Sequence, residues 1–298
     1  MGEDWRRRAE AVPYVVAQGR GAGPTIYLQA VSDGDELNGL AVIRRVVAEL
    51  DCSQLRGALI AVLVANPGAF AANAPTDPRD GRKLNRCFPG LADGSVTERL
   101  AYLLFHELVL YADLVIDLHQ NGTTPMIPEV RVRSGRRGPR HAESLELAMA
   151  FGLPHILDQQ GPSGQLARAA PARGIPAIDP ELGGNLGFDP VAIELGVRGV
   201  RNVMVHYGLL EGQPPPRQTP YIARRLAPLI ADTGGIVDFQ VALGDQVSAG
   251  QPIARCTDIF GHQASVITAP ANGVLWIRRN QPVVTVGDTI GAIGVEEE

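Results

Sequence analysis

Cysteines, aromatic residues and long apolar runs are all scarce in this chain of 298 residues. Cys52, Cys87 and Cys256 lie far apart and have no metal-binding spacing, so we expect reduced thiols and no disulfide framework. No apolar run is long enough to span a bilayer, and the charged start of the chain is not followed by the apolar stretch of a secretory signal. These absences predict a cytoplasmic protein.

Positive charge is not in excess either. The net charge of −5 and a pI of about 5.7 argue against a surface for nucleic acid or an anionic membrane, so we expect neither partner. With 45% hydrophobic residues, the chain has ample core for one large domain or two moderate ones.

Lysine is absent from residues 231–298. This part has short apolar runs and two similar turns, Gly244-Asp245 and Gly287-Asp288, which predict a small all-β sandwich or barrel. Modules of this kind resemble those that carry lipoyl or biotin on a lysine, and the missing lysine excludes that role. The proline-rich stretch from residue 213 to 220 predicts a stiff linker. We therefore expect one domain over residues 1–212, and the linker with the β module over 213–298.

Buried strands and helices alternate in the first domain. Apolar runs at 25–31, 58–65, 112–119 and 175–181 predict strands, and helices are expected at 40–50, 95–111 and 190–197. The pair Ser95 and Glu98 has the spacing of a capping box. A long loop is expected from Ala69 to Asp80. Strands joined by helices make parallel pairs, so the pattern predicts an α/β fold with a mixed, largely parallel sheet flanked by helices.

An acidic turn, Asp33-Gly-Asp-Glu36, follows the strand at 25–31. Ligand sites in open α/β sheets lie at the carboxyl ends of strands, where grouped carboxylates favour a divalent cation. A structural alternative is that Asp35 caps the next helix while the other acids are solvated.

Further polar candidates follow other predicted elements. Asn85 and Arg86 form an amide and guanidinium pair suited to a carboxylate or carbonyl oxygen, although Arg86 could instead pair with a structural acid. Asp117 and His119 point to the same side of a strand end. Glu181 ends another strand and is a candidate general base, with a solvated turn carboxylate as the alternative. Five arginines between 131 and 140 are expected in a flap over an anionic substrate or in a solvated loop.

Four of these stretches together resemble, in order and spacing, the succinylglutamate desuccinylase/aspartoacylase family. They are Asp33-Gly-Asp-Glu-Leu-Asn-Gly39, Leu84-Asn-Arg-Cys-Phe-Pro-Gly90, Asp117-Leu-His119 and Pro180-Glu-Leu-Gly-Gly184. The family consists of zinc amide hydrolases with a carboxypeptidase-like fold, and the likeness is greatest to bacterial deacylases of N-acylated diamino acids. The resemblance implies that Glu36 and His119 are metal ligands, that Glu181 activates the attacking water, and that Asn85 and Arg86 bind the substrate.

Two positions depart from the family pattern. The first metal ligand of the family is a histidine, and Asp33 stands at that position. Two carboxylates and one imidazole can hold a dication but cancel its charge, so manganese, iron or cobalt become alternatives to zinc (Zn). The arginine that polarises the scissile carbonyl in the family is also missing, so either Arg79 or Arg82 replaces it or the role is unfilled.

We therefore expect an enzyme that hydrolyses an amide in a small N-acyl amino acid or related metabolite. One divalent metal would be held by Asp33, Glu36 and His119, and the chain could assemble as a homo-oligomer. The alternative from another functional class is a non-catalytic descendant that binds a small ligand or a partner at the same place.

Overall fold

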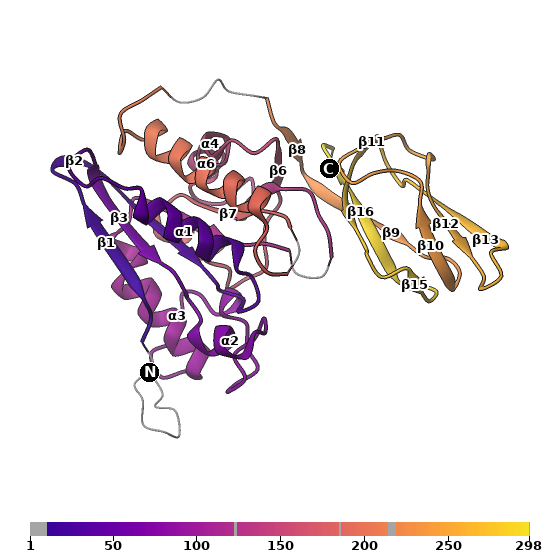
Figure 1. Cartoon of the computed structure of the whole chain (residues 1–298), viewed down its shortest axis with the longest axis horizontal. Helices are drawn as coiled ribbons and strands as arrows, with labels where there is room; N and C mark the ends of the chain where they lie inside the picture. The colour runs from indigo at the N-terminus through magenta and orange to yellow at the C-terminus, as the bar shows by residue number, and fades with distance from the viewer. Residues whose placement is uncertain (1–10, 122–123, 185, 214–218, 298) are drawn as a thin grey trace.

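A computed structural model describes residues 11–121, 124–184, 186–213 and 219–297. Its largest element is an eight-stranded sheet, shown in Figure 1. Five neighbouring pairs are parallel, and the β1–β3 and β7–β5 pairs are antiparallel. The spatial order is β1 (Tyr14–Gln18), β3 (Arg56–Val62), β2 (Gly21–Ala30), β4 (Leu114–Leu118), β7 (Ala177–Glu181), β5 (Glu129–Val132), β6 (His155–Asp158) and β8 (Tyr221–Ala223).

Helices cover both faces of this sheet because both faces are apolar. On one face lie α1 (Asn38–Ala48), α4 (His141–Phe151) and α6 (Pro190–His206), and their apolar residues share a core with Ile26, Leu28 and Ile116. On the other face lie α3 (Val96–Glu107) and α5 (Leu166–Ala169), packed on Tyr27 and Val115. We call the sheet and these helices the large domain.

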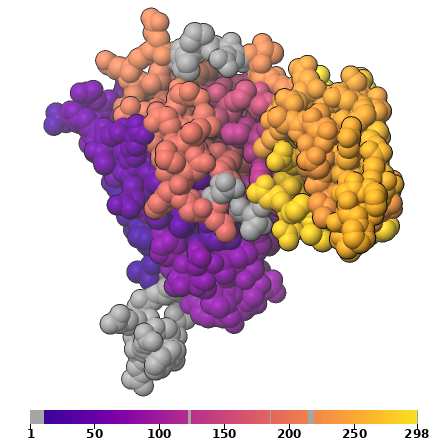
Figure 2. All heavy atoms as spheres, turned by 45° about the vertical axis from the view of Figure 1, so that its right-hand side comes forward, coloured from indigo at the N-terminus to yellow at the C-terminus, as the bar shows by residue number. Residues whose placement is uncertain are grey.

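The remaining strands form two antiparallel four-stranded sheets that enclose a second apolar core. One sheet has the order β13 (Gln263–Thr268), β12 (Pro252–Thr257), β10 (Gly235–Phe239) and β15 (Val283–Val284). The other has the order β11 (Gln246–Val247), β14 (Gly273–Arg278), β16 (Thr289–Val295) and β9 (Arg225–Ile230). Figure 2 shows this β module, orange to yellow, as a lobe beside the large domain.

The predicted fold class, a mixed and largely parallel sheet with helices plus a small all-β part, is confirmed. The domain boundary at 212 stays a prediction. Beyond it, β8 pairs with β6 and so extends the large sheet. Residues 214–218 of the predicted linker lie outside the described residues.

A short helix was missed by the sequence analysis. The predicted loop from Ala69 to Asp80 begins with a short helix, α2 (Pro67–Ala72). Asn66 caps it by accepting a hydrogen bond from the Ala69 N–H, and Pro67 takes the first helical position. Asn66-Pro67-Gly68 thus starts a helix shortly after β3, which ends at Val62.

The capping box at the start of α3 is present as predicted. The Ser95 N–H donates to Glu98 Oε2 at 2.8 Å, and Ser95 Oγ accepts from the Glu98 N–H. Removing the hydroxyl leaves a helix-terminal N–H without its acceptor. We expect Ser95→Ala to lower the free energy of unfolding by about 1 kcal/mol in urea melts. Ser163→Ala, at an exposed loop position, is the control and should change it little. Equal effects of the two substitutions would contradict the capping role.

Candidate active site

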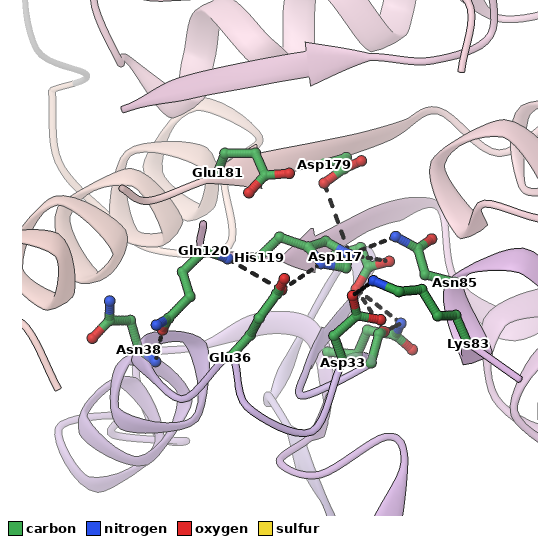
Figure 3. Close-up of polar contacts among 12 residues, drawn as sticks. Asp33, Glu36, Asn38, Lys83, Asn85, Asp117, His119, Gln120, Asp179 and Glu181 are labelled. Atoms are coloured by element: carbon green, nitrogen blue, oxygen red, sulfur yellow. Dashed lines mark hydrogen bonds and ion pairs between the residues drawn. The ribbon is translucent and has the colours of Figure 1, made fainter. Parts of the chain in front are cut away.

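The carboxyl ends of three adjacent parallel strands bring the predicted residues to one edge of the large sheet. The turn after β2 carries Asp33 and Glu36, His119 directly follows β4, and Glu181 ends β7. His119 and Glu181 are bridged through their backbones. In Figure 3, Glu181 lies above Glu36. His119 lies next to Glu36, between it and the side chains of Asp117 and Asp33. The sheet therefore collects side chains that are up to 148 positions apart, from 33 to 181, in the sequence.

The acidic turn has a constrained backbone. Val31, just before it, has φ 59°, an unfavourable conformation for a β-branched residue. A Cβ on Gly34 would lie 2.1 Å from the carbonyl carbon of Ala69, so α2 packs directly against the turn. The capping role considered for Asp35 is wrong, because no side chain in the described part of the chain caps the start of α1. Instead, the Asn38 N–H donates to Gln120 Oε1 at 2.6 Å.

Glu36 and His119 are in direct contact. Glu36 Oε2 lies 2.8 Å from His119 Nδ1 and also accepts a hydrogen bond from the Gln120 N–H at 3.3 Å. Burial raises the pKa of Glu36 to about 8, against the opposing effect of His119. A carboxylate and a ring nitrogen at this distance share either a proton or a cation.

The other ring nitrogen of His119 faces acids as well. Its Nε2 lies 3.1 Å from Asp117 Oδ2, 3.2 Å from Asn85 Nδ2 and 3.8 Å from Asp179 Oδ1. Although burial disfavours its cation, the carboxylates of Asp117, Asp179 and Glu36 raise the pKa of His119 well above the usual value. A carboxylate on Nε2 with Nδ1 turned to the site is the arrangement that orients metal-binding histidines.

Asp33 contacts a residue that the sequence analysis did not single out. Its Oδ2 accepts from Lys83 Nζ at 2.6 Å, while its Oδ1 is buried and has no hydrogen-bond partner among the described residues. Within the same residues, no three His, Cys, Asp or Glu side chains form a group that could hold a metal ion. The structure thus brings Glu36 and His119 together and leaves Asp33 paired with an ammonium.

Lys83 is the only lysine in the chain, although the chain contains 27 lysines and arginines. Such a rare residue next to the Asn85 and Arg86 pair was a signal in the sequence. Its pairing with Asp33 could not be seen there, since the two are 50 positions apart.

Glu181 faces an arginine on a neighbouring strand. Its Oε1 lies 2.6 Å from Arg131 NH1, and burial raises the pKa of Glu181 while Arg131 opposes the rise. The predicted flap or solvated loop is wrong for Arg131 and Arg133, because both lie on or directly after the buried strand β5. Arg133 contacts Asp179 at 3.4 Å. The alternation of charged with apolar residues from 129 to 133 was the missed strand signal.

The other predicted arginines have partners outside this cluster. Arg79 pairs with the buried Asp77, and Arg82 lies 3.3 Å from Glu98 and is half exposed. Arg86 donates to the carbonyl oxygen of Asn85 and is exposed. Arg79 and Arg82, the two cations predicted to polarise the carbonyl, thus pair with Asp77 and Glu98, whereas Lys83 of the same loop pairs with Asp33.

The charges of the buried cluster favour an added cation. Among the residues that the structure describes, six carboxyl groups face three permanent cations, Lys83, Arg131 and Arg133. The acids are Asp33, Glu36, Asp117, Glu129, Asp179 and Glu181. Grouped buried carboxylates are stable only when protonated or neutralised. The excess negative charge, the orphaned Asp33 Oδ1 and the oriented imidazole fit a divalent metal in their donor chemistry.

Comparisons of the sequence and of the structure with known proteins point to the same family. Residues 22–207 match the succinylglutamate desuccinylase/aspartoacylase catalytic domain. The chain is 34% identical over 294 residues to N-alpha-acetyl-L-2,4-diaminobutyric acid deacetylase of Halomonas elongata, covering 96% of this chain and 86% of the relative. It superposes on the product-bound ectoine utilization protein EutE (DoeB) of Ruegeria pomeroyi with a TM-score of 0.84 and 27% identity, covering 95% and 89% of the two chains. A succinylglutamate desuccinylase/aspartoacylase structure from Rhodobacter sphaeroides gives 0.83 and 25%, covering 96% and 89%.

The contact between Gly34 and α2 can be tested directly. A methyl group on Gly34 would overlap the Ala69 backbone, so Gly34→Ala should lower the free energy of unfolding by about 1–3 kcal/mol, measured in urea. Gly234→Ala is the matched control, because its Cβ would be no closer than 3.5 Å to the Val284 carbonyl oxygen. Unchanged stability of Gly34→Ala would mean that α2 does not hold the acidic turn.

Proposed function

The chain belongs to the succinylglutamate desuccinylase/aspartoacylase family of amide hydrolases, and from that premise we propose that it removes the acetyl group from an N-acetylated diamino acid. The observation that carries the proposal is the buried contact of Glu36 with His119, with Glu181 ending the adjacent strand β7. These are the residue types that metal-assisted amide hydrolysis uses.

Asp33, Glu36 and His119 would hold one divalent metal, with zinc as the first choice and manganese, iron or cobalt as alternatives. The donor set supports this choice, since Asp33 Oδ1 is buried without a partner and His119 Nδ1 faces Glu36. When bound, such an ion polarises the amide carbonyl and acidifies water. Among the described residues no helix is long and apolar enough to cross a membrane, and the three cysteines are free. Both findings support the further proposal of a cytoplasmic site of action.

Glu181 would act as the general base. It removes a proton from the attacking water and delivers that proton to the nitrogen of the leaving amine, so that the C–N bond breaks as the acid is released. Burial and the ion pair with Arg131 support this role, because they give the carboxylate one fixed orientation. Asn85, through its unpartnered buried Oδ1 or its amide N–H, would orient the substrate beside His119.

The negative charge of the cluster supports a diamino acid substrate. A diamino acid that is acetylated on one nitrogen keeps an ammonium on the other, and the excess carboxylates would attract it. Arg86 would bind the substrate carboxylate by turning its guanidinium from the Asn85 carbonyl. The relative from Halomonas elongata is named for a substrate of this class.

Glu181→Gln tests the proposal, because the amide keeps the shape of the side chain and cannot accept the proton. We expect kcat for N-alpha-acetyl-L-2,4-diaminobutyrate to fall by about 10²–10⁴-fold while the metal content of the purified protein is unchanged. Glu143→Gln removes an exposed carboxylate that pairs with Arg140 and should leave kcat unaltered.

Two results would contradict the proposal. One is a wild-type protein that takes up no divalent metal and hydrolyses no member of a panel of N-acyl amino acids. The other is a Glu181→Gln variant as active as the wild type. Activity that appears only after Asp33→His would favour the non-catalytic alternative.

A further inference from the structure

Lys83 and Asp33 form an ion pair near Glu36 and His119, the other two proposed metal ligands (Figure 3). Lys83 Nζ lies 2.6 Å from Asp33 Oδ2, and the Asp33 side chain is 8% exposed. The other oxygen, Oδ1, is buried without a partner in the described part of the chain. One carboxylate oxygen is thus neutralised by an ammonium, and the other stays available as a ligand.

The charge balance gives this pair a function. Asp33, Glu36 and His119 alone would cancel the two charges of a dication and leave it a weak electrophile. Asp33 together with Lys83 carries no net charge, so the same ligands with Lys83 leave one positive charge at the centre. Building on the proposed function, we propose that Asp33 and Lys83 act as one neutral ligand unit, in which Lys83 keeps the bound metal electrophilic.

Metal titration separates this role from a structural one. Lys83→Met removes the repulsion between ammonium and dication, so we expect zinc to bind about tenfold tighter or more in competition with a chelator, while kcat falls. Arg82→Met is the matched control, since it removes a half-exposed cation one position earlier that pairs with Glu98. Zinc affinity that is equal or weaker in Lys83→Met would overturn the inference.

Amine labelling tests the pair without using metal or activity. Lys83 carries the only ε-amino group of the chain, so peptide mass spectrometry can follow its acetylation alone. We expect Asp33→Asn to speed its labelling several-fold, and Glu181→Gln to leave the rate unchanged. An unaltered rate in Asp33→Asn would overturn the inference. Failure of the proposed function would be seen separately, as loss of hydrolysis in the wild type.

A second inference concerns the β module. Its strand β14 presents Trp276 to the large domain, where the ring is fully buried among Met126, Leu157 and Ala223. Backbone hydrogen bonds fix this contact, with the Ile127 N–H donating to the Trp276 carbonyl oxygen at 3.1 Å. The interface is therefore packed and hydrogen-bonded just before β5, the strand that carries Arg131.

Two hydrogen bonds and one ion pair lead from this tryptophan to the proposed base. Trp276 Nε1 donates to Glu129 Oε2, Arg131 Nε donates to Glu129 Oε1, and Arg131 NH1 contacts Glu181 Oε1, each at 2.6 Å. Glu129 and Glu181 are register partners on β5 and β7. Glu129 is fully buried, so its two oxygens depend on these two donors.

Because Glu129 holds the guanidinium by its Nε, the orientation of NH1 toward Glu181 depends on how Glu129 is held. We infer that Trp276 is a positioning residue for Glu181, acting through Glu129 and Arg131. The β module then contributes to catalysis without touching substrate. This inference also rests on the proposed role of Glu181.

Trp276→Phe keeps the aromatic packing and removes the donor. We expect kcat to fall about tenfold with KM within twofold, because the base is misplaced while substrate contacts remain. Tyr221→Phe is the matched control, because it removes a hydroxyl in the same interface. This hydroxyl donates to the Gly294 carbonyl oxygen and not to a residue that contacts Glu181. Equal kcat values for the two variants would overturn the inference.

A double-mutant cycle keeps the test valid if Trp276→Phe weakens the fold. If Trp276 acts on Glu181 through Arg131, adding Trp276→Phe to Arg131→Lys should lower kcat no further than Arg131→Lys alone does. Independent effects of the two substitutions on kcat would multiply. If the wild type proves inactive, the proposed function fails and the cycle is run on the free energy of unfolding. Additive effects of the two substitutions on the free energy of unfolding would mean that Trp276 and Arg131 are not coupled, which would overturn the inference.

Discussion

The buried excess of carboxylates is the constraint on which the site depends. Asp33, Glu36 and Glu181 come from a turn and a strand end that the parallel sheet brings together, and each is largely withdrawn from water. Such a group is tolerated only with compensating cations or protons. Lys83 compensates Asp33, Arg131 is shared between Glu129 and Glu181, and Glu36 shares its charge with His119. In the proposed function, substrate binding, base strength and metal binding would all depend on this balance.

Much of the architecture could be predicted from the sequence. Continuous apolar runs identified β2, β3 and β4, and the Ser95 and Glu98 spacing identified the start of α3. The acidic turn, His119 and Glu181 could be assigned to one edge because parallel strands end at the same side. The fold class, a mixed sheet with helices plus a small all-β part, followed from the change in apolar periodicity and needed no knowledge of contacts.

The pairings within the site could not be predicted, because they join residues that are distant in the chain. Lys83 reaches Asp33 from a loop, and Trp276 reaches Glu129 from another sheet. β5 was missed because its charged residues, which face other charges inside the protein, gave the stretch the composition of a surface loop. A polar sequence usually indicates an exposed segment, but charged residues can be buried when they are paired. The pairing becomes visible only when the partner residue is known.

A crystal structure of the protein grown with zinc, with data collected on both sides of the zinc absorption edge, tests the central claim most directly. The account predicts one anomalous peak within bonding distance of Glu36, of Nδ1 of His119 and of one oxygen of Asp33, with Lys83 on the other oxygen. A structure without such a peak, in which the Lys83 ammonium alone neutralises the acids, would contradict it.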